Sequence, residues 1–424
     1  MLDECLACHA GRVATVPGAS GKYAADPFKQ QSIGCENCHG PGKQHVEVHE
    51  AKPGALHDTI VNPAKLPAAQ RDSVCNQCHL QGAARIPRYG RTYYDFRPGQ
   101  RLDETLVVFL TGTGVAGGKT ESVRHVQQMM ASRCFTASQG RLGCSSCHDA
   151  HATVSEQDAK RFYRQRCLAC HEQNDCHSPL ADRQAEQDSC FTCHMPRLPA
   201  ADIAHTAQTD HRVLVRPNDS PAAPHPAQPE KLLFFDKADE RLPPWEVTRT
   251  SGLAVVKQLL EQGRVSELSV IDSLLAPVLE VAPDDTRVMN ALTEVALKRS
   301  DLAAAETYAR QALAVDPQNE AALVALTLVS YQTGRYAEGL EFSDRALAIN
   351  PTLDKIYAHR ADMFRLSQRL PEGIVAAELS LQLNPRLIPV REWLVHAYRD
   401  DGQAAKSEQH AAILRRMEAV PPAK

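Results

Sequence analysis

Twelve of the fourteen cysteines occur in six copies of one pattern, in which two cysteines are separated by two residues and a histidine follows immediately. The copies are Cys5, Cys8 and His9; Cys35, Cys38 and His39; Cys75, Cys78 and His79; Cys144, Cys147 and His148; Cys167, Cys170 and His171; and Cys190, Cys193 and His194. Two cysteines one helical turn apart can form thioethers to the two vinyl groups of one porphyrin, and the next residue can ligate its iron. The pattern therefore predicts six covalently attached haem c groups.

Two other interpretations of paired cysteines are zinc sites with four cysteine ligands and disulfide bonds. Neither of them requires a histidine directly after the second cysteine. Only 18 of the 424 residues are histidine, so six such histidines arise by chance with a probability on the order of 10⁻⁸. The following histidines therefore favour haem.

Six haems within about 210 residues leave roughly 35 residues for each haem, too few for separate protein cores. The porphyrins themselves must form much of the core, and covalent attachment holds them there as disulfides or metals do in other small domains. Neighbouring haems are thus expected to lie in close array and to pass electrons. Cys134 and Cys176 lie outside the motifs, and either a disulfide or two buried thiols is compatible with the sequence.

Each haem iron has a second axial position, so six more ligands are needed if all irons are closed and low-spin. Eight further histidines lie in the motif-bearing region, whereas only four lie in the remaining 213 residues. The eight are His45, His49, His57, His125, His151, His177, His205 and His211. Their enrichment favours ligation over an ordinary surface role.

Five of these eight histidines are the stronger candidates. His151 is too near His148 to reach the far side of the same haem, which favours a neighbouring haem. His45 follows a Gly-Pro-Gly turn, and His125 stands alone between the third and fourth motifs. His205 and His211 are six residues apart and therefore off a common helix face, which favours two different irons.

The sixth place remains open among His177, His49 and His57. The sequence does not choose between them.

Three stretches resemble the multihaem c-type cytochromes related to cytochrome c-554, hydroxylamine oxidoreductase and the pentahaem nitrite reductases. They are the second motif with Gly-Pro-Gly and His45, the fourth motif with His151, and the sixth motif with Met-Pro-Arg followed by His205 and His211. The version resembled is fused to C-terminal tetratricopeptide repeats, and the two parts cover most of the chain. The resemblance implies bis-histidine haems in packed pairs, with distal ligands His45, His125, His151, His205 and His211.

The chain also departs from that family. It has no Cys-x-x-Cys-Lys motif, so the lysine-ligated catalytic haem of the nitrite reductases has no counterpart, and nothing identifies a crosslinked haem. Haem attachment takes place outside the cytoplasmic membrane, so such a protein needs an export signal. Only three residues separate Met1 from Cys5, which leaves no room for one before the first motif. We expect a periplasmic or extracellular protein whose export signal lies upstream of this chain.

The composition argues against nucleic-acid binding and against a membrane span. The formal net charge is −4 and aromatic residues make up 5%, so the basic surface of a nucleic-acid binder is not expected. The longest apolar run, 106–110, is far shorter than the ~20 residues of a membrane span. No nucleic-acid partner and no transmembrane segment are predicted.

The C-terminal half contains an internal repeat. Five prolines in residues 216–229 favour an extended spacer and mark a domain boundary. Beyond them, Pro283, Pro317, Pro351 and Pro385 recur every 34 residues, the tetratricopeptide period. Small residues repeat in phase, first at 305, 339, 373 and 407 and then at 309, 343, 377 and 411, and leucines recur at 313, 347 and 381. Each repeat is expected to be a helix pair that buries its apolar face by stacking on its neighbours, and residues 253–281 are expected to form a degenerate first repeat or cap.

The predicted fold is mainly α, with a loop-rich multihaem cytochrome c domain (1–211), a proline-rich linker (212–250) and an α-solenoid of tetratricopeptide repeats (251–424). The predicted function is electron transfer through closely packed bis-histidine haems, with the repeats docking a redox protein partner or a second copy of the chain. One alternative is an oxidoreductase that acts on a small nitrogen or sulfur compound at one open haem. Another is a subunit of a haem-wired oligomer or filament. No catalytic residue is assigned.

Overall fold

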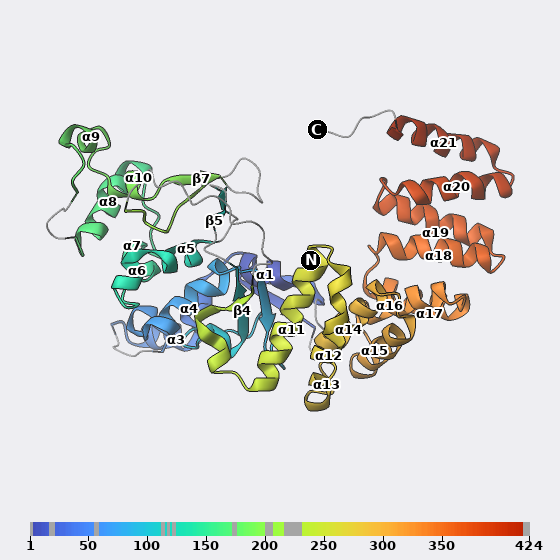
Figure 1. Cartoon of the computed structure of the whole chain (residues 1–424), viewed down its shortest axis with the longest axis horizontal. Coiled ribbons are helices and arrows are strands. Elements are labelled where there is room, and N and C mark those ends of the chain that lie inside the picture. Colours follow the sequence, from blue (N-terminus) through green and yellow to red (C-terminus); the bar gives the residue numbers. More distant parts are fainter. Residues whose placement is uncertain are drawn as a thin grey trace. The chain divides into compact units, whose positions relative to one another are not determined.

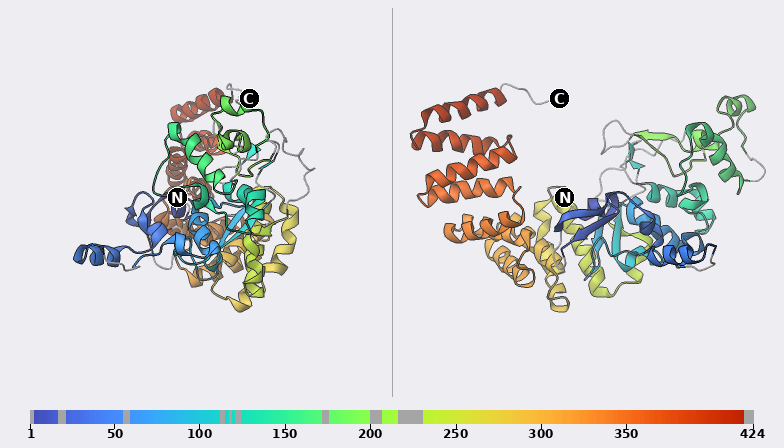
Figure 2. Two further views of the ribbon diagram at one scale, coloured as in Figure 1. Left: turned by 90° about the vertical axis from the view of Figure 1, so that its left-hand side faces the viewer. Right: turned by 180° about the vertical axis from the view of Figure 1, so that it is seen from behind.

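The structure is a computed structural model, which describes residues 3–16, 22–54, 59–111, 115–116, 119–120, 124–171, 176–199, 207–215 and 231–418. The chain divides into an N-terminal unit that ends at Gln258 and a C-terminal unit that begins at Leu259. Figure 1 and Figure 2 show the course of the chain through both units. Each unit is described by itself below.

Short helices separated by loops carry the motif cysteines of the N-terminal unit. The α-helices are α1 (Asp3–His9), α2 (Cys35–His39), α3 (Lys43–Ala51), α4 (Ala68–His79), α5 (His125–Ala131), α6 (Arg133–Ala137), α7 (Cys144–Cys147), α8 (Glu156–Leu168), α9 (Leu180–Ala185), α10 (Cys190–His194) and α11 (Pro244–Glu261). The 3-10 helices are η1 (Pro63–Lys65), η2 (Leu102–Glu104) and η3 (Phe235–Glu240).

Small antiparallel sheets lie between these helices. The strands are β1 (Arg12–Thr15), β2 (Tyr23–Gln30), β3 (Ala84–Pro87), β4 (Leu106–Leu110), β5 (Val115–Ala116), β6 (Lys119–Thr120), β7 (Arg197–Pro199), β8 (Ala207–Thr209) and β9 (Leu233–Phe234). Pairs form between β1 and β2, β5 and β6, and β7 and β8, and a three-stranded sheet has the order β3-β4-β9. The N-terminal unit is thus a mixture of helix, strand and loop, and the mainly α prediction holds for the C-terminal unit.

Strand β4 is the centre of the N-terminal core. Its residues 106–109 are almost completely buried, as expected for a continuous apolar run between two neighbouring strands. Leu80 and Leu102 pack in the same hydrophobic cluster. Because Leu80 directly follows the third motif, this cluster holds the end of α4 in place.

Residues 231–258 fold onto the N-terminal unit, which moves the boundary predicted from the prolines. In β9, Phe234 pairs with Phe109 of β4. Glu246 of α11 accepts hydrogen bonds from Arg88 Nη2 at 2.7 Å and from the Tyr89 amide at 2.9 Å. The predicted linker 212–250 therefore includes about twenty residues that belong to the N-terminal unit. The proline-rich residues 216–229 lie outside the described part of the chain.

The C-terminal unit is an array of helix pairs. After η4 (Val265–Val270), α12 (Ile271–Leu275) and α13 (Val278–Val281), the helices are α14 (Thr286–Lys298), α15 (Leu302–Val315), α16 (Glu320–Gln332), α17 (Tyr336–Ile349), α18 (Asp354–Leu366), α19 (Leu370–Leu383), α20 (Ile388–Asp400) and α21 (Ala404–Glu418). The first helices of the pairs begin at 286, 320, 354 and 388, and the second helices at 302, 336, 370 and 404. Both series have the predicted 34-residue spacing, and Figure 1 shows the pairs stacked in chain order.

The repeat positions have the expected burial. Ala305, Ala309, Ser343 and Ala377 are completely buried, and Ser407 is 5% exposed. Each predicted proline lies three residues before the first helix of its pair, in the turn between repeats. The helical repeat array is confirmed. Residues 253–281 instead form the end of α11 and three short helical segments, so they make an irregular cap and not a full helix pair.

Candidate functional site

Each of the six motifs lies in or at the end of a helix. The cysteines of α1, α2, α4, α7 and α10 lie within those helices, and the fifth motif runs from the end of α8 into the following turn. One turn of helix places residues i and i+3 on the same side, which is the arrangement that two thioethers to one porphyrin require. The helices of the second and fourth motifs begin after extended glycines, and the amides of Gly34 and Gly143 donate to Asn37 and Ser146.

Cys170 of the fifth motif departs from the helical arrangement that the motif spacing predicts. Helix α8 ends at Leu168, so Cys167 is helical, whereas Cys170 lies in the turn that follows and is exposed. The Cys170 and His171 amides both donate to the Cys167 carbonyl oxygen, at 3.1 Å and 3.0 Å. These two bonds close a tight turn at the end of the helix. Cys170 therefore lies beyond the end of α8, but these bonds still place it one turn after Cys167.

Exposure is not confined to Cys170. Cys5, Cys35 and Cys193 are also exposed, and the other motif cysteines are half-buried. The motif helices are short, so each one has little protein around it to cover a sulfur. This agrees with the expectation that the motif-bearing residues are too few to form a separate protein core for each motif.

The third motif contacts three other motifs. Cys8 Sγ of the first motif donates to the Gln77 carbonyl oxygen at 3.6 Å, and Gln77 Nε2 donates to the Asn37 carbonyl oxygen of the second motif at 2.9 Å. The thiols of Cys75 and Cys144 lie close enough to shift each other's pKa, which places the third motif beside the fourth. The third motif is therefore the junction of the first four.

The last three motifs continue this series. Helix α8, which ends in the fifth motif, packs against α7 of the fourth motif and α10 of the sixth. The thiols of Cys167 and Cys190 lie close enough to shift each other's pKa. The Tyr163 ring lies between these motifs, 5.8 Å from the His148 ring centroid and 5.6 Å from that of Phe191. All six motifs are thus joined in one unbroken series of contacts.

The thiol contacts between motifs shift the pKa values of the sulfurs. The hydrogen bond from Cys78, with help from Arg85, lowers the pKa of Cys8 to about 5 and raises that of Cys78. In the same way the contact with Cys167 lowers the pKa of Cys190 to about 6. All fourteen cysteines are unbridged, and this includes Cys134 and Cys176. The motif sulfurs that meet therefore lie in close pairs between neighbouring motifs.

Four histidines gather where the third and fourth motifs meet. The His148 and His211 ring centroids are 6.3 Å apart with a 27° interplanar angle, and the His125 ring is 4.7 Å from His211. His79 is also close enough to affect the charge on His125. Burial lowers the pKa of His125 to about 4 and also lowers that of His211. Burial thus favours the neutral imidazole, the form that binds metals.

A second pair of histidines joins the second motif to the segment after the fourth. The His39 and His151 ring centroids are 5.8 Å apart, and the rings are within 13° of parallel. His151 therefore lies opposite the histidine of another motif and not that of its own, as its closeness to His148 in sequence predicts. Its side chain is 80% exposed.

Backbone carbonyls bind the Nδ1 atoms of three histidines. His39 Nδ1 bonds to the Val61 oxygen at 2.7 Å, His194 Nδ1 to the Leu214 oxygen at 2.6 Å, and His211 Nδ1 to the Thr209 oxygen at 2.7 Å. A carbonyl oxygen accepts only, so Nδ1 carries the proton and Nε2 keeps its lone pair. This second interaction is typical of metal-ligating histidines, because it orients the ring and makes it a stronger ligand.

The other predicted ligands have weaker structural support. His45 lies on α3 beside His49, with ring centroids 4.4 Å apart, and bonds to Thr59 Oγ1 through Nδ1 at 3.3 Å. His177 is exposed. His57 and His205 lie outside the described residues. The motif histidines His9 and His171 are exposed, and no described histidine ring contacts either of them.

The centroid spacings of two histidine pairs can be compared with the spacing of two imidazoles bound to one iron. Because a metal–imidazole bond is about 2 Å long, two rings on opposite sides of one iron have centroids roughly 6 Å apart. The two opposed pairs have 5.8 Å and 6.3 Å. Among the described residues, no three or more His, Cys, Asp or Glu side chains form a group able to hold a metal ion. The Nδ1 atom of His125 is buried without a hydrogen-bond partner, which leaves that imidazole free for a ligand.

Several residues of this region were not singled out in the sequence. Gln128 is completely buried, and its Oε1 accepts from the His211 amide at 2.9 Å. Asp210 is also completely buried, and Arg212 binds it at 2.5 Å. Tyr163 lies between three motifs, and Arg85 reaches Cys8 from β3 at 3.2 Å. No pattern in the sequence marks these residues, because their roles depend on contacts between distant segments.

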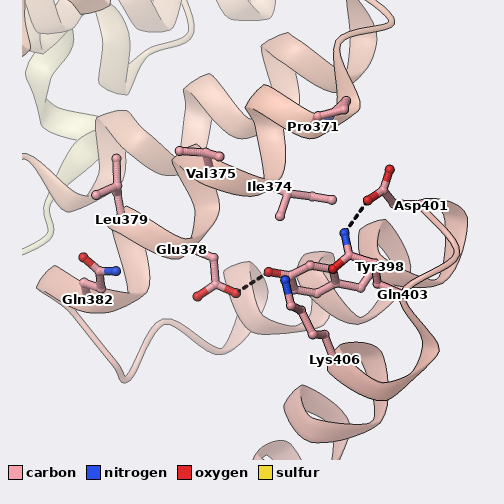
Figure 3. A pocket seen from close by; sticks show the side chains of 10 residues that line it. All are labelled: Pro371, Ile374, Val375, Glu378, Leu379, Gln382, Tyr398, Asp401, Gln403 and Lys406. Atoms are coloured by element: carbon pink, nitrogen blue, oxygen red, sulfur yellow. Dashed lines mark hydrogen bonds between the residues drawn. The ribbon is translucent and has the colours of Figure 1, made fainter.

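The repeat array has a groove of about 330 Å³ between its last two helix pairs. Figure 3 shows Tyr398 within it, with Ile374 and Val375 on the neighbouring helix. Tyr398 Oη donates to Glu378 at 2.9 Å, and Lys406 Nζ lies 5.0 Å from the centre of its ring. A second cavity, of about 210 Å³, lies in the N-terminal unit against α4, and Leu106, Val126 and Phe135 are among its lining residues. No described helix is long and apolar enough to cross a membrane.

Comparisons with known proteins bear on the repeat array. No family model matches the chain, and no curated protein matches it. Among solved structures, one of MamA is 14% identical, covers 39% of this chain and 96% of its own length, and has a TM-score of 0.36. MamA residues 41 to the end from Desulfovibrio magneticus RS-1 are 16% identical, cover 42% and 97%, and have a TM-score of 0.38. The C-terminal helical region thus has a limited likeness to MamA.

Proposed function

We propose that this chain is an exported multihaem c-type cytochrome that carries electrons through six covalently attached haems. The observation that supports this most is the unbroken series of contacts between the six Cys-x-x-Cys-His motifs. Haems attached to motifs in contact are held close together, and closely spaced haems exchange electrons. The site is proposed to lie outside the cytoplasm, where haem is attached to such motifs.

In this proposal, cysteines attach the haems and histidines ligate the irons. The twelve motif cysteines would hold the porphyrins, and each of the six motif histidines would supply one ligand to an iron. His151 would be the second ligand at the haem of His39, and His211 at the haem of His148, because the ring centroids of these pairs are 5.8 Å and 6.3 Å apart. His125 is assigned to the haem of His79, the remaining motif histidine of that cluster.

The haem iron supplies reversible one-electron chemistry when it is bound. Backbone carbonyls would orient the rings of His39, His194 and His211. An iron with two imidazole ligands has no free position for a substrate, which favours electron transfer over catalysis.

The repeat array is proposed to dock a redox protein partner or a second copy of the chain. Stacked helix pairs form extended surfaces suited to binding peptides or helices. The MamA likeness has too low a TM-score to identify that partner, so the docking role rests on the helix-pair architecture.

Intact mass of the full chain, produced with c-type haem attachment, tests the cofactor. We expect the polypeptide mass plus six haems, and a low-spin optical spectrum. A Cys144→Ala, Cys147→Ala variant should carry five haems, and a Cys134→Ala variant, outside the motifs, should keep six. A protein that holds zinc and no haem would contradict the proposal.

A further inference from the structure

Arg85 is a buried cation between the first and third motifs. It belongs to β3, where it pairs with Val108 of the central strand β4, and only 3% of its surface is exposed. Its Nη1 donates to Cys8 Sγ at 3.2 Å, and its Nη2 donates to the Gln77 carbonyl oxygen at 2.6 Å. The guanidinium group therefore touches both motifs at once.

No carboxylate among the described residues pairs with this guanidinium. The acidic side chain that shares Tyr93 Oη with the Arg85 backbone is Glu4, which accepts from that hydroxyl at 2.6 Å and lies 3.5 Å from Lys257 Nζ. The Nε atom of Arg85 is buried without any hydrogen-bond partner. A buried charge in this situation acts over a longer range than a surface charge, because little water screens it.

Haem attachment would remove the one partner of Arg85 that can carry negative charge. A free Cys8 sulfur can ionise, but a Cys8 thioether is neutral and has no proton to lose. The remaining contact, the Gln77 carbonyl, is neutral as well. With haem attached, the positive charge at this junction is therefore left uncompensated by any described residue.

We propose that Arg85 sets the reduction potential at the junction of the first and third motifs and makes it the part of the haem series that is reduced first. Reduction adds one negative charge to a haem, and a buried positive charge beside it favours that state. The inference rests on the proposed function, because it concerns haems attached to these motifs. It gives the series a direction, since electrons collect where the potential is most positive.

A redox titration of the full chain tests this proposal, with Arg85→Gln as the variant. We expect one or two of the six haems to become at least tenfold harder to reduce, which is about 59 mV for one electron, while the other haems keep their potentials. Arg85→Lys keeps the charge and should remain near the unmodified protein. Arg91→Gln removes an exposed positive charge six residues away, so it should leave all the potentials unchanged.

The possible outcomes distinguish a failure of the Arg85 proposal from a failure of the proposed function. Haem content is measured first by intact mass, and a chain without haem would overturn the proposed function itself. Six haems in every variant with identical titrations for Arg85→Gln and Arg91→Gln would show that a haem carboxylate neutralises Arg85, and would overturn this proposal alone. If Arg85→Gln fails to fold, Arg85→Met and Arg85→Lys are compared instead. Their side chains are similar in length but differ in charge. Equal haem potentials in these two variants would also refute the proposal.

Discussion

Two hydrogen bonds restrain His211, which we propose as a haem ligand. The Thr209 carbonyl binds its Nδ1 at 2.7 Å, and Gln128 binds its backbone amide at 2.9 Å. The Nδ1 bond restrains the ring, whose centroid lies 6.3 Å from that of His148. A histidine held in this way loses less side-chain conformational entropy when it becomes a metal ligand.

Replacing His211 or His151 by alanine should change one haem in each variant from low spin to high spin. The reason is that each substitution removes one of two strong imidazole ligands from an iron. Optical and paramagnetic resonance spectra measure the change. His396→Ala, an exposed histidine of the repeat array, is the control and should leave all haems low-spin. Unchanged low-spin spectra in both ligand variants would remove these two residues from the ligand set.

The motif residues and the ligand pairs differ in how far they can be predicted. The six Cys-x-x-Cys-His motifs are local patterns, so the sequence shows them completely, although the end of α8 before Cys170 is not visible in the pattern. That His151 reaches a neighbouring motif also follows from its distance to His148. Its opposition to His39 does not, because it depends on how segments more than one hundred residues apart pack together.

At the scale of elements, the turn within each helix pair adopts the same backbone conformation. Ser300, Gly334, Gln368 and Gly402, again 34 residues apart, all have φ between 60° and 75°. Glycine adopts this left-handed conformation without strain, whereas serine and glutamine do so at some cost. The turns were not predicted, because two of the four positions lack the glycine that normally marks them.

Two glycines of the array should respond differently to alanine. A Cβ at Gly373 would lie 2.7 Å from the Ala361 carbonyl oxygen, whereas one at Gly339 would lie 2.7 Å from the flexible Met363 side chain. Backbone cannot move aside as a methionine can, so Gly373→Ala should lower the free energy of unfolding by roughly 1–3 kcal/mol. Gly339→Ala should be close to neutral, since the better helix propensity of alanine offsets the contact by about 1 kcal/mol. Chemical denaturation of both variants measures the difference, and equal effects would contradict the packing argument.

Glu306 links neighbouring repeats through charge. It accepts from Arg335 Nη2 at 2.6 Å and from Arg310 Nε at 2.9 Å, and these contacts, Arg335 first, lower its pKa to about 2. A lowered pKa means that the carboxylate stabilises the fold above its ordinary pKa of about 4.3. That contribution decreases as the pH falls from there toward 2.

Glu306→Gln should therefore lower the melting temperature of the repeat unit at pH 7 and have little effect near pH 2. The loss at pH 7 should be about 1 kcal/mol, because the network is partly exposed to water. Glu294→Gln changes an exposed glutamate with no ion pair among the described residues and is the matched control. A loss that is the same at both pH values would show that the charge of Glu306 is not the cause.

At the scale of the molecule, the two halves were predictable to different degrees. The repeat array depends on contacts between neighbouring segments, so its 34-residue period predicted both the helices and their burial. The N-terminal unit depends on distant contacts such as Phe234 with Phe109 and Arg88 with Glu246. Strand pairing of this kind overrides local composition, which is why residues 231–258 were predicted as linker and repeat.

Binding of carbon monoxide distinguishes an electron-transfer protein from a haem enzyme. If every iron has two imidazole ligands, carbon monoxide can bind only by displacing one of them. We therefore expect carbon monoxide to change little of the reduced spectrum of the full chain, and nitrite or hydroxylamine to leave its reduction unaffected. His211→Ala opens one iron by design and should bind carbon monoxide, which shows that the assay detects a vacant position. Strong binding at one haem of the unmodified chain, together with turnover of nitrite or hydroxylamine by reduced viologen, would replace electron transfer with the enzyme alternative.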